Sequence, residues 1–289
     1  MQRLKNSRLM LILSMAIFGT LAPFVRNISV SSGELALYRA ILAALLILVV
    51  FALTKQRIDF KAIRKELPLL LLSGIAMGFN WILLFEAYKY TTVAVATLSY
   101  YFAPVIVTVA CPILFREKMG AKQWICFAMS TLGIVLITGT GDFSGGGQHL
   151  KGIAFGLGAA VLYATVILLN KFIQNVAGIR RTFLQFLSAI GVLVPYVLCT
   201  DGVNLGQLNT VGWINLLIVG LVHTGVTYCL YFSALKALPG QEAAILSYID
   251  PLVAVLISVF ALGETMTAVQ LFGGALILGF TLWNELKTE

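Results

Sequence analysis

A few ionisable side chains stand inside long apolar runs, where a charge is costly. Asp250 precedes Pro251 in the run 242–262, and Arg39 lies in the run 34–53. A carboxyl group in hydrocarbon costs several kcal/mol, so it should face a cavity or a partner. Asp250 is therefore the strongest candidate for binding a cation or taking up a coupling proton. A structural pairing with a neighbouring group is the alternative.

Arg39 and His223 are the next candidates. Arg39 could bind the carboxylate of a substrate through two parallel N–H donors, while pairing with Glu34 or with a helix end explains it equally well. His223, which lies within an apolar run, could relay protons near neutral pH. A hydrogen-bonded core histidine is the plainer interpretation.

Aromatic and small polar side chains share several of these runs. Amphipathic rings with sparse polar groups suit a pocket for a partly apolar solute, and ring faces also attract cations. Packing or contact with lipid is the alternative for each ring. The candidate substrate-binding set, besides Asp250, Arg39 and His223, is Phe79, Asn80, Trp81, Ser99, Tyr100, Tyr101, Tyr163, Tyr228, Ser247 and Tyr248.

Composition indicates what must position these groups. The chain has 289 residues, of which 60% are hydrophobic and only 11% are charged, whereas soluble domains carry about 25% charged residues. A chain with so few charges must turn most of its surface toward lipid, and we predict an all-α protein with ten transmembrane helices. The apolar runs are 9–27, 34–53, 67–88, 93–115, 123–138, 152–169, 183–199, 212–234, 242–262 and 269–284.

The basic residues favour one orientation of these helices. If the N-terminus is cytoplasmic and there are ten spans, 16 of the 20 Lys and Arg residues fall on the inner side. Arg26, Lys89 and Lys151 fall on the outer side, and Arg39 lies within a span. This bias predicts a multi-pass protein of the cell membrane with both termini in the cytoplasm. The net charge of +8 then serves orientation and contact with anionic lipid, not nucleic-acid binding.

An internal repeat divides the chain. At an offset of 147 residues the matched pairs are Gly78 with Gly225, Lys89 with Lys236, Pro104 with Pro251, Glu117 with Glu264 and Gln123 with Gln270; after a one-residue gap Tyr100 matches Tyr248. We predict a first repeat at 1–140, a Gly-rich linker at 141–150 and a second repeat at 151–289. Five spans per copy make the two copies inverted, an arrangement common in secondary transporters.

Prolines mark three places where helices should bend. Pro104 and Pro251 stand at matched positions, and Pro23 lies in the first run. Proline lacks an N–H, so it frees a carbonyl one turn earlier, which could coordinate a ligand or simply accompany a kink. Matched interruptions in two repeats point to a binding site between them.

These motifs resemble the EamA family of the drug/metabolite transporter superfamily. The resemblance rests on Phe18-Gly19-Thr20, Arg39, Phe115-Arg116-Glu117-Lys118-Met119, Ser247-Tyr248-Ile249-Asp250-Pro251, Leu262-Gly263-Glu264-Thr265 and the glycines Gly273 and Gly274. It implies alternating access through a central cavity lined by spans 1–4 and 6–9, with spans 5 and 10 peripheral. Members of the family export amino acids and other metabolites, and some carry nucleotide sugars or quaternary amines. Asp250, where Ala103 stands in the first half, departs from a neutral cavity.

Other chemistry finds little support. We find no GxxxxGK[ST], HExxH or GxSxG motif and no metal-binding spacing of the four cysteines, so we expect neither an enzyme nor a cofactor or metal. The expected partners are a small-molecule substrate, membrane lipid and protons.

Glycines at 152, 156, 273, 274 and 279 suit close helix packing and leave monomer or homodimer open. Glu117 and Glu264 could form gates with basic residues, with helix-end solvation as the plainer reading, and Glu86 should snorkel to the interface.

The sequence favours a secondary transporter that exports small metabolites. Amino acids are the leading cargo, with a weak lean to aromatic or large apolar ones because of the ring-rich runs. An intramembrane lipid-handling protein or enzyme, and a carrier of quaternary amines or other metabolites, are the alternatives.

Overall fold

The computed structural model describes residues 2–55, 58, 63–115, 120–139, 147–236, 238 and 240–286. All regular secondary structure in these residues is helical. The first half holds α1 (Gln2–Gly19), α2 (Leu21–Arg26), α3 (Ser32–Thr54), α5 (Leu67–Tyr90), α6 (Val93–Tyr100), α7 (Ala103–Phe115) and α8 (Ala121–Gly139). The second half holds α9 (Gln148–Phe172), α10 (Gly178–Cys199), η2 (Leu205–Gln207), α11 (Thr210–Leu217), η3 (Ile218–Val226), α12 (Thr227–Leu235), α13 (Gly240–Ser247), α14 (Ile249–Leu256), η4 (Ile257–Ala261) and α15 (Ala268–Glu285).

Seven helical segments in the described chain are long and apolar enough to cross a membrane. They are α1 with α2, α3, α5, α6 with α7, α9, α10, and α11 through α12. Three shorter apolar helices lie at 121–137, 249–261 and 268–284. The protein is therefore an all-helical, multi-pass membrane protein, while the count of ten crossings stays a prediction.

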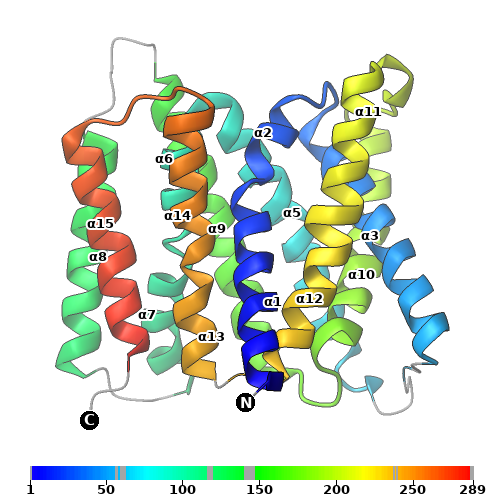
Figure 1. Ribbon diagram of the computed structural model, residues 1–289, viewed down its shortest axis with the longest axis horizontal. Helices are drawn as coiled ribbons and strands as arrows, with labels where there is room; N and C mark the ends of the chain where they lie inside the picture. The colour runs from blue at the N-terminus through cyan, green and yellow to red at the C-terminus, as the bar shows by residue number, and fades with distance from the viewer. Residues whose placement is uncertain are drawn as a thin grey trace.

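The helices stand side by side in one bundle (Figure 1). α5 packs against α9 and α10, α3 against α10 and η3, and α1 against α12 and α14. α6 and α7 pack on α9, and α8 pairs chiefly with α15 at one edge of the bundle. α1 begins and α15 ends at the same end of the molecule, which we call the terminal end; α2 and the start of α6 lie at the opposite end.

Three helical segments of the described chain are interrupted close to a proline. α1 ends one residue before α2, which contains Pro23; α6 and α7 are separated at Tyr101 and Phe102; α13 and α14 are separated at Tyr248. Pro104 and Pro251 follow their breaks within three residues. Because proline cannot donate to the preceding turn, the carbonyls four residues earlier lose their helical donors.

Side-chain hydrogen bonds cap the first turns of α3 and α15. Ser31 and Glu34 form a capping box at the start of α3, and Thr267 and Gln270 form one at the start of α15. α9 begins at Gln148, so the last residues of the predicted linker are helical. The linker residues 141–146 lie outside the described residues.

Glycines allow the backbones of α8 and α15 to approach closely. A Cβ built on Gly273 would lie 2.7 Å from the carbonyl oxygen of Gly133, and one built on Gly133 would lie 2.6 Å from that of Gly273. Gly279, on the same helix, has no atom within 4 Å of such a Cβ. Small residues that let backbones approach are a common basis of helix association in membranes.

Gly273→Ala should therefore destabilise the protein. The added methyl group must push α8 and α15 apart, at a cost of about 1–3 kcal/mol. Thermal unfolding of the purified protein in detergent measures this, with Gly279→Ala as the matched control. Equal melting temperatures for the two variants would contradict the packing described here.

Candidate functional site

A cavity of about 530 Å³ lies among the helices of both halves. It is bounded by the helix interruptions just described, so broken backbone borders it. The predicted residues among its lining are Arg39, Trp81, Tyr100, Tyr101, Pro104, Tyr163, Tyr228, Ser247, Tyr248 and Asp250.

Asp250 stands at the break between α13 and α14, and its carboxylate faces the cavity. The Tyr101 hydroxyl, at the break between α6 and α7, donates a hydrogen bond to Asp250 Oδ2 at 2.6 Å. The backbone of α1 approaches closely here, since a Cβ on Gly19 would lie 2.6 Å from the Asp250 carbonyl oxygen. Within the described residues, the structure gives this carboxylate no cationic partner at salt-bridge distance. A charge-assisted bond from tyrosine leaves room for a further donor.

Arg39 contributes the opposite charge to the same cavity. Its Nε donates to Thr224 Oγ1 at 3.0 Å, and its guanidinium lies 4.4 Å from the centre of the Trp81 ring. In the described part of the chain, no hydrogen bond involves its two terminal nitrogens. A guanidinium held by its Nε and by a ring presents a planar pair of donors, the arrangement that carboxylates bind best.

The expected alternative of an Arg39–Glu34 pair is wrong. Glu34 accepts hydrogen bonds from the Asn204 backbone N–H at 2.6 Å and from the Tyr38 hydroxyl at 2.9 Å, and it caps α3. The physical reason is local: the capping box holds Glu34 at the helix end, five residues before Arg39, which is about 1.4 turns and so turns the two side chains to different faces of α3.

Aromatic side chains line the cavity in two groups, one around Tyr100 and one around Tyr228. Tyr100 stacks on Tyr163 with 5.2 Å between ring centroids, and Tyr228 contacts Phe18 edge-on at 5.3 Å. Tyr228 lines the same cavity as Arg39 and Asp250. The cavity is thus a partly apolar chamber lined by two arginines, one carboxylate and several phenol groups.

Other predicted residues lie outside this lining, and the polar ones among them form hydrogen bonds within the protein. Asn80 donates to the Ala159 carbonyl at 2.6 Å, and Ser99 donates to Val95 at 2.8 Å. His223 lies 3.1 Å from Thr20 Oγ1, between the α1–α2 break and η3. The other three outside the lining are Phe79, which packs on Tyr196, and the bend prolines Pro23 and Pro251.

The three glutamates at predicted helix ends have different environments. Glu86 accepts a bond from Lys89 at 2.8 Å, so it has a partner and does not simply extend into water. Glu264 forms an ion pair with Arg26 at 2.5 Å. Glu117 lies outside the described residues.

Several lining residues were not anticipated. Gln185 and Arg181 face inward one turn apart on α10, and Gln185 Nε2 donates to Ser73 Oγ at 2.5 Å and to Asn170 Oδ1 at 2.8 Å. Polar residues at i and i+4 in an otherwise apolar run are the sequence signal that marks this inner face. The other unanticipated lining residues include Phe18, Tyr88, Thr97, Asn170, Thr182, Tyr231 and Phe232.

Comparison with known sequences places this architecture. The sequence profile of the EamA-like transporter family matches residues 6–139 and again residues 150–284. The chain belongs to the EamA-like transporter family. The resemblance expected from the sequence is confirmed, and each half of this EamA-like protein carries its own match.

The relatives of this EamA-like protein are named as transporters. The uncharacterized transporter YxxF of Bacillus subtilis (strain 168) is 29% identical over 271 residues, covering 91% of this chain and 86% of that one. An uncharacterized transporter of Archaeoglobus fulgidus is 29% identical over 281 residues, 95% of both chains. A crystal structure with 16% identity and a TM-score of 0.65, covering 95% of both chains, shares the fold. The protein is thus a membrane transporter of small molecules.

The Tyr101–Asp250 bond generates a pH-dependent prediction. Tyr101→Phe removes a donor that favours the ionised carboxylate, at a cost of about 1–3 kcal/mol. The loss of melting temperature should be larger at alkaline pH, where Asp250 is ionised, than at acid pH, where it is protonated. Asp250→Asn keeps an acceptor for Tyr101, so a double variant with Tyr101→Phe should lose this pH dependence. A penalty independent of pH would contradict the arrangement.

Proposed function

We propose that this protein is a secondary transporter that exports amino acids, with a lean to aromatic or large apolar ones, by alternating access. The observation that carries the proposal is the presence of a cation and a carboxylate in one ring-lined cavity. An amino acid carries the complementary pair of charges and, for aromatic or large apolar members, a side chain that the rings can contact.

Each pole of the cavity suits one end of such a substrate. The terminal nitrogens of Arg39 would bind the substrate carboxylate, and Asp250 with the faces of the nearby tyrosines would bind its ammonium group. Trp81 and Tyr228 would contact the side chain. Pro104 and Pro251 cannot donate to the carbonyls four residues earlier, which would add acceptors for N–H groups of the substrate.

This polarity weighs against the second candidate cargo. A quaternary amine would gain from Asp250 and the rings, but it would also meet the Arg39 guanidinium, which repels cations. Among the described residues, no acidic side chain lies at salt-bridge distance from Arg39 to offset this repulsion. A zwitterion uses both poles and a quaternary amine uses one.

The packing pattern supports the inverted repeat on which alternating access depends. If the ten predicted spans are numbered in chain order, spans 1–5 of the first half correspond to spans 6–10 of the second half. Exchanging the halves then turns the contact of α5 with α9 into that of α12 with α1, and the contact of α3 with η3 into that of α10 with α5. The pairs α3–α10 and α8–α15 correspond to themselves. Both termini at one end of the bundle agree with this scheme, and the basic residues favour the cytoplasm for that end.

Counterflow of labelled amino acids in proteoliposomes tests the proposal. Phenylalanine, tryptophan and leucine should exchange, and choline should not. Arg39→Lys and Asp250→Asn should each lower exchange at least about tenfold, the effect of losing one charge-assisted hydrogen bond. Thr165→Val is the matched control, because Thr165 is only partly buried, lies outside the cavity lining and donates to the Val161 carbonyl of its own helix.

Two outcomes would contradict the proposal. Exchange of choline that survives Arg39→Lys would favour the quaternary-amine carrier. Turnover of lipid without movement of any metabolite would favour the lipid-handling alternative.

A further inference from the structure

The two ends of the cavity differ. At the terminal end, Arg181, Phe232 and Leu235 line both the cavity and a second groove of about 550 Å³, whose other residues include the exposed Arg180 and Lys236. The cavity therefore continues toward that end. At the opposite end, Val93, Ala94, Val95 and Ala96 at the start of α6 are fully buried.

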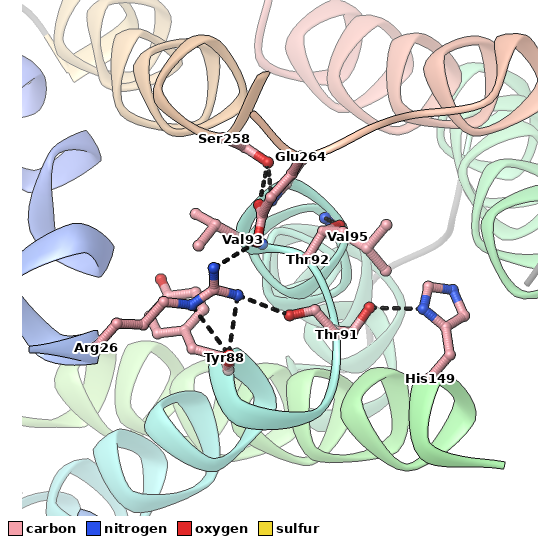
Figure 2. Close-up of polar contacts among 10 residues, drawn as sticks. Arg26, Tyr88, Thr91, Thr92, Val93, Val95, His149, Ser258 and Glu264 are labelled. Atoms are coloured by element: carbon pink, nitrogen blue, oxygen red, sulfur yellow. Dashed lines mark hydrogen bonds and ion pairs between the residues drawn. The ribbon is translucent and has the colours of Figure 1, made fainter. Parts of the chain in front are cut away.

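A polar network covers the buried end (Figure 2). Arg26, the last residue of α2, forms an ion pair with Glu264, which lies between η4 and α15. Glu264 Oε2 accepts a hydrogen bond from the Val93 N–H at 2.8 Å and one from Ser258 Oγ at 2.5 Å. Arg26 Nη2 donates to the carbonyls of Tyr88 and Thr91, each at 3.0 Å.

The geometry of the pair matches the polarity of the backbone beneath it. The guanidinium binds carbonyls at the C-terminal end of α5, and the carboxylate binds an N–H at the N-terminal end of α6. These are the signs of charge that such helix ends favour. Ser258 Oγ extends the arrangement by accepting the N–H of Ala94 at 3.2 Å. The turn between α5 and α6 is thus bound from two sides by opposite charges.

The network joins segments that are distant in sequence. Arg26 and Glu264 are 238 residues apart and come from the two halves of the chain. His149, at the start of α9, adds a fourth segment because its Nδ1 lies 2.8 Å from Thr91 Oγ1. Directly below, the Tyr88 side chain lines the cavity while its carbonyl accepts from Arg26. The network therefore lies between the cavity and this end of the protein.

We infer that Arg26 and Glu264 form a latch that closes the cavity at the end opposite the termini, and that the latch must open for substrate to pass. The latch is built on the α5–α6 turn, which stays as the common base, so opening separates α2 or the η4–α15 connection from that turn. The role of the latch in transport rests on the proposed function, but the closure itself is measurable without transport.

The ion pair at the terminal end differs in setting. Arg8 on α1 pairs with Glu242 on α13, and their side chains are 57% and 27% exposed, against 31% and 12% for Arg26 and Glu264. Water screens the first pair more strongly, so the second contributes more to holding its helices together. This difference agrees with a cavity that is closed at one end only.

Labelling of a cysteine in the cavity tests the latch. Ser247→Cys supplies the reporter in a background where Cys111, Cys126, Cys199 and Cys229 are replaced by alanine. The protein is placed in vesicles, and those whose C-terminal tag is protected from external protease present the latch end to an added membrane-impermeant maleimide. We expect slow labelling with the latch intact and a several-fold faster rate with Glu264→Gln or with Arg26→Gln.

Matched variants make the result specific. Glu86→Gln removes another ion pair near the same end of α5 and should leave the labelling rate unchanged. The reversed pair, Arg26→Glu with Glu264→Arg, should label as fast as the single variants, because a carboxylate would then face the carbonyls of Tyr88 and Thr91. Unchanged size-exclusion profiles and melting temperatures within a few degrees identify variants that remain folded.

The outcomes separate the latch from the cargo. Labelling of Glu264→Gln and Arg26→Gln at the Glu86→Gln rate would overturn the latch, whatever the protein transports. If the reversed pair restored slow labelling, the ion pair alone would close the cavity, and the claim that the latch depends on the adjacent helix ends would be overturned. Faster labelling of Glu264→Gln and Arg26→Gln in a protein that exchanges no amino acid would support the latch and contradict only the proposed function.

Discussion

The cost of a charge inside an apolar helix bundle organises this protein. A buried ion must be paired, bound by dipoles or left beside water, since an unsatisfied one would unfold the structure. Arg26 and Glu264 satisfy each other and two helix ends. Arg39 and Asp250 are instead held on one side by neutral groups, Thr224 and Tyr101, and face a cavity on the other. The first arrangement closes the bundle and the second leaves binding capacity.

The helix interruptions follow from the same constraint. Broken backbone is tolerated at membrane depth where it lines a cavity, because its freed carbonyls can be reached by water or ligand. The break at Tyr101–Phe102 places Tyr101 against Asp250, which lies beside the break at Tyr248. Prolines at matched sequence positions thus follow a helix break in each half. The side chains at the two breaks differ, because the second half supplies the acid Asp250 and the first half supplies the phenol of Tyr101 that binds it.

Part of this architecture could be predicted from the sequence, because it depends on local or repeated signals. The length of the apolar runs predicts membrane helices, and the offset of the repeat singles out Tyr100 and Tyr248, both of which line the cavity. Asp250 stands out because a lone acid in an apolar run has few innocuous explanations. The repeat boundaries and the role of each site residue stay predictions.

The rest depends on contacts between distant segments. Nothing near Arg39 in the sequence points to Thr224, 185 residues away, and the nearer Glu34 is held by its own cap. Asn80 and Ser99 have the polarity of binding residues, but carbonyls within the bundle bind their donors. The rotation of a helix about its axis decides which of its polar side chains face a cavity. The sequence of a single apolar run does not determine that rotation.

On the proposed function, a zwitterionic substrate binds between Arg39 and Asp250, against Trp81. The other tryptophans, Trp124, Trp213 and Trp283, are at least 40% exposed and can be replaced by phenylalanine, which leaves Trp81 as the one indole reporter. The emission of Trp81 in purified protein, titrated with leucine, should shift saturably and should stop responding in Arg39→Lys and Asp250→Asn. An unchanged emission at leucine concentrations that support exchange would contradict the account.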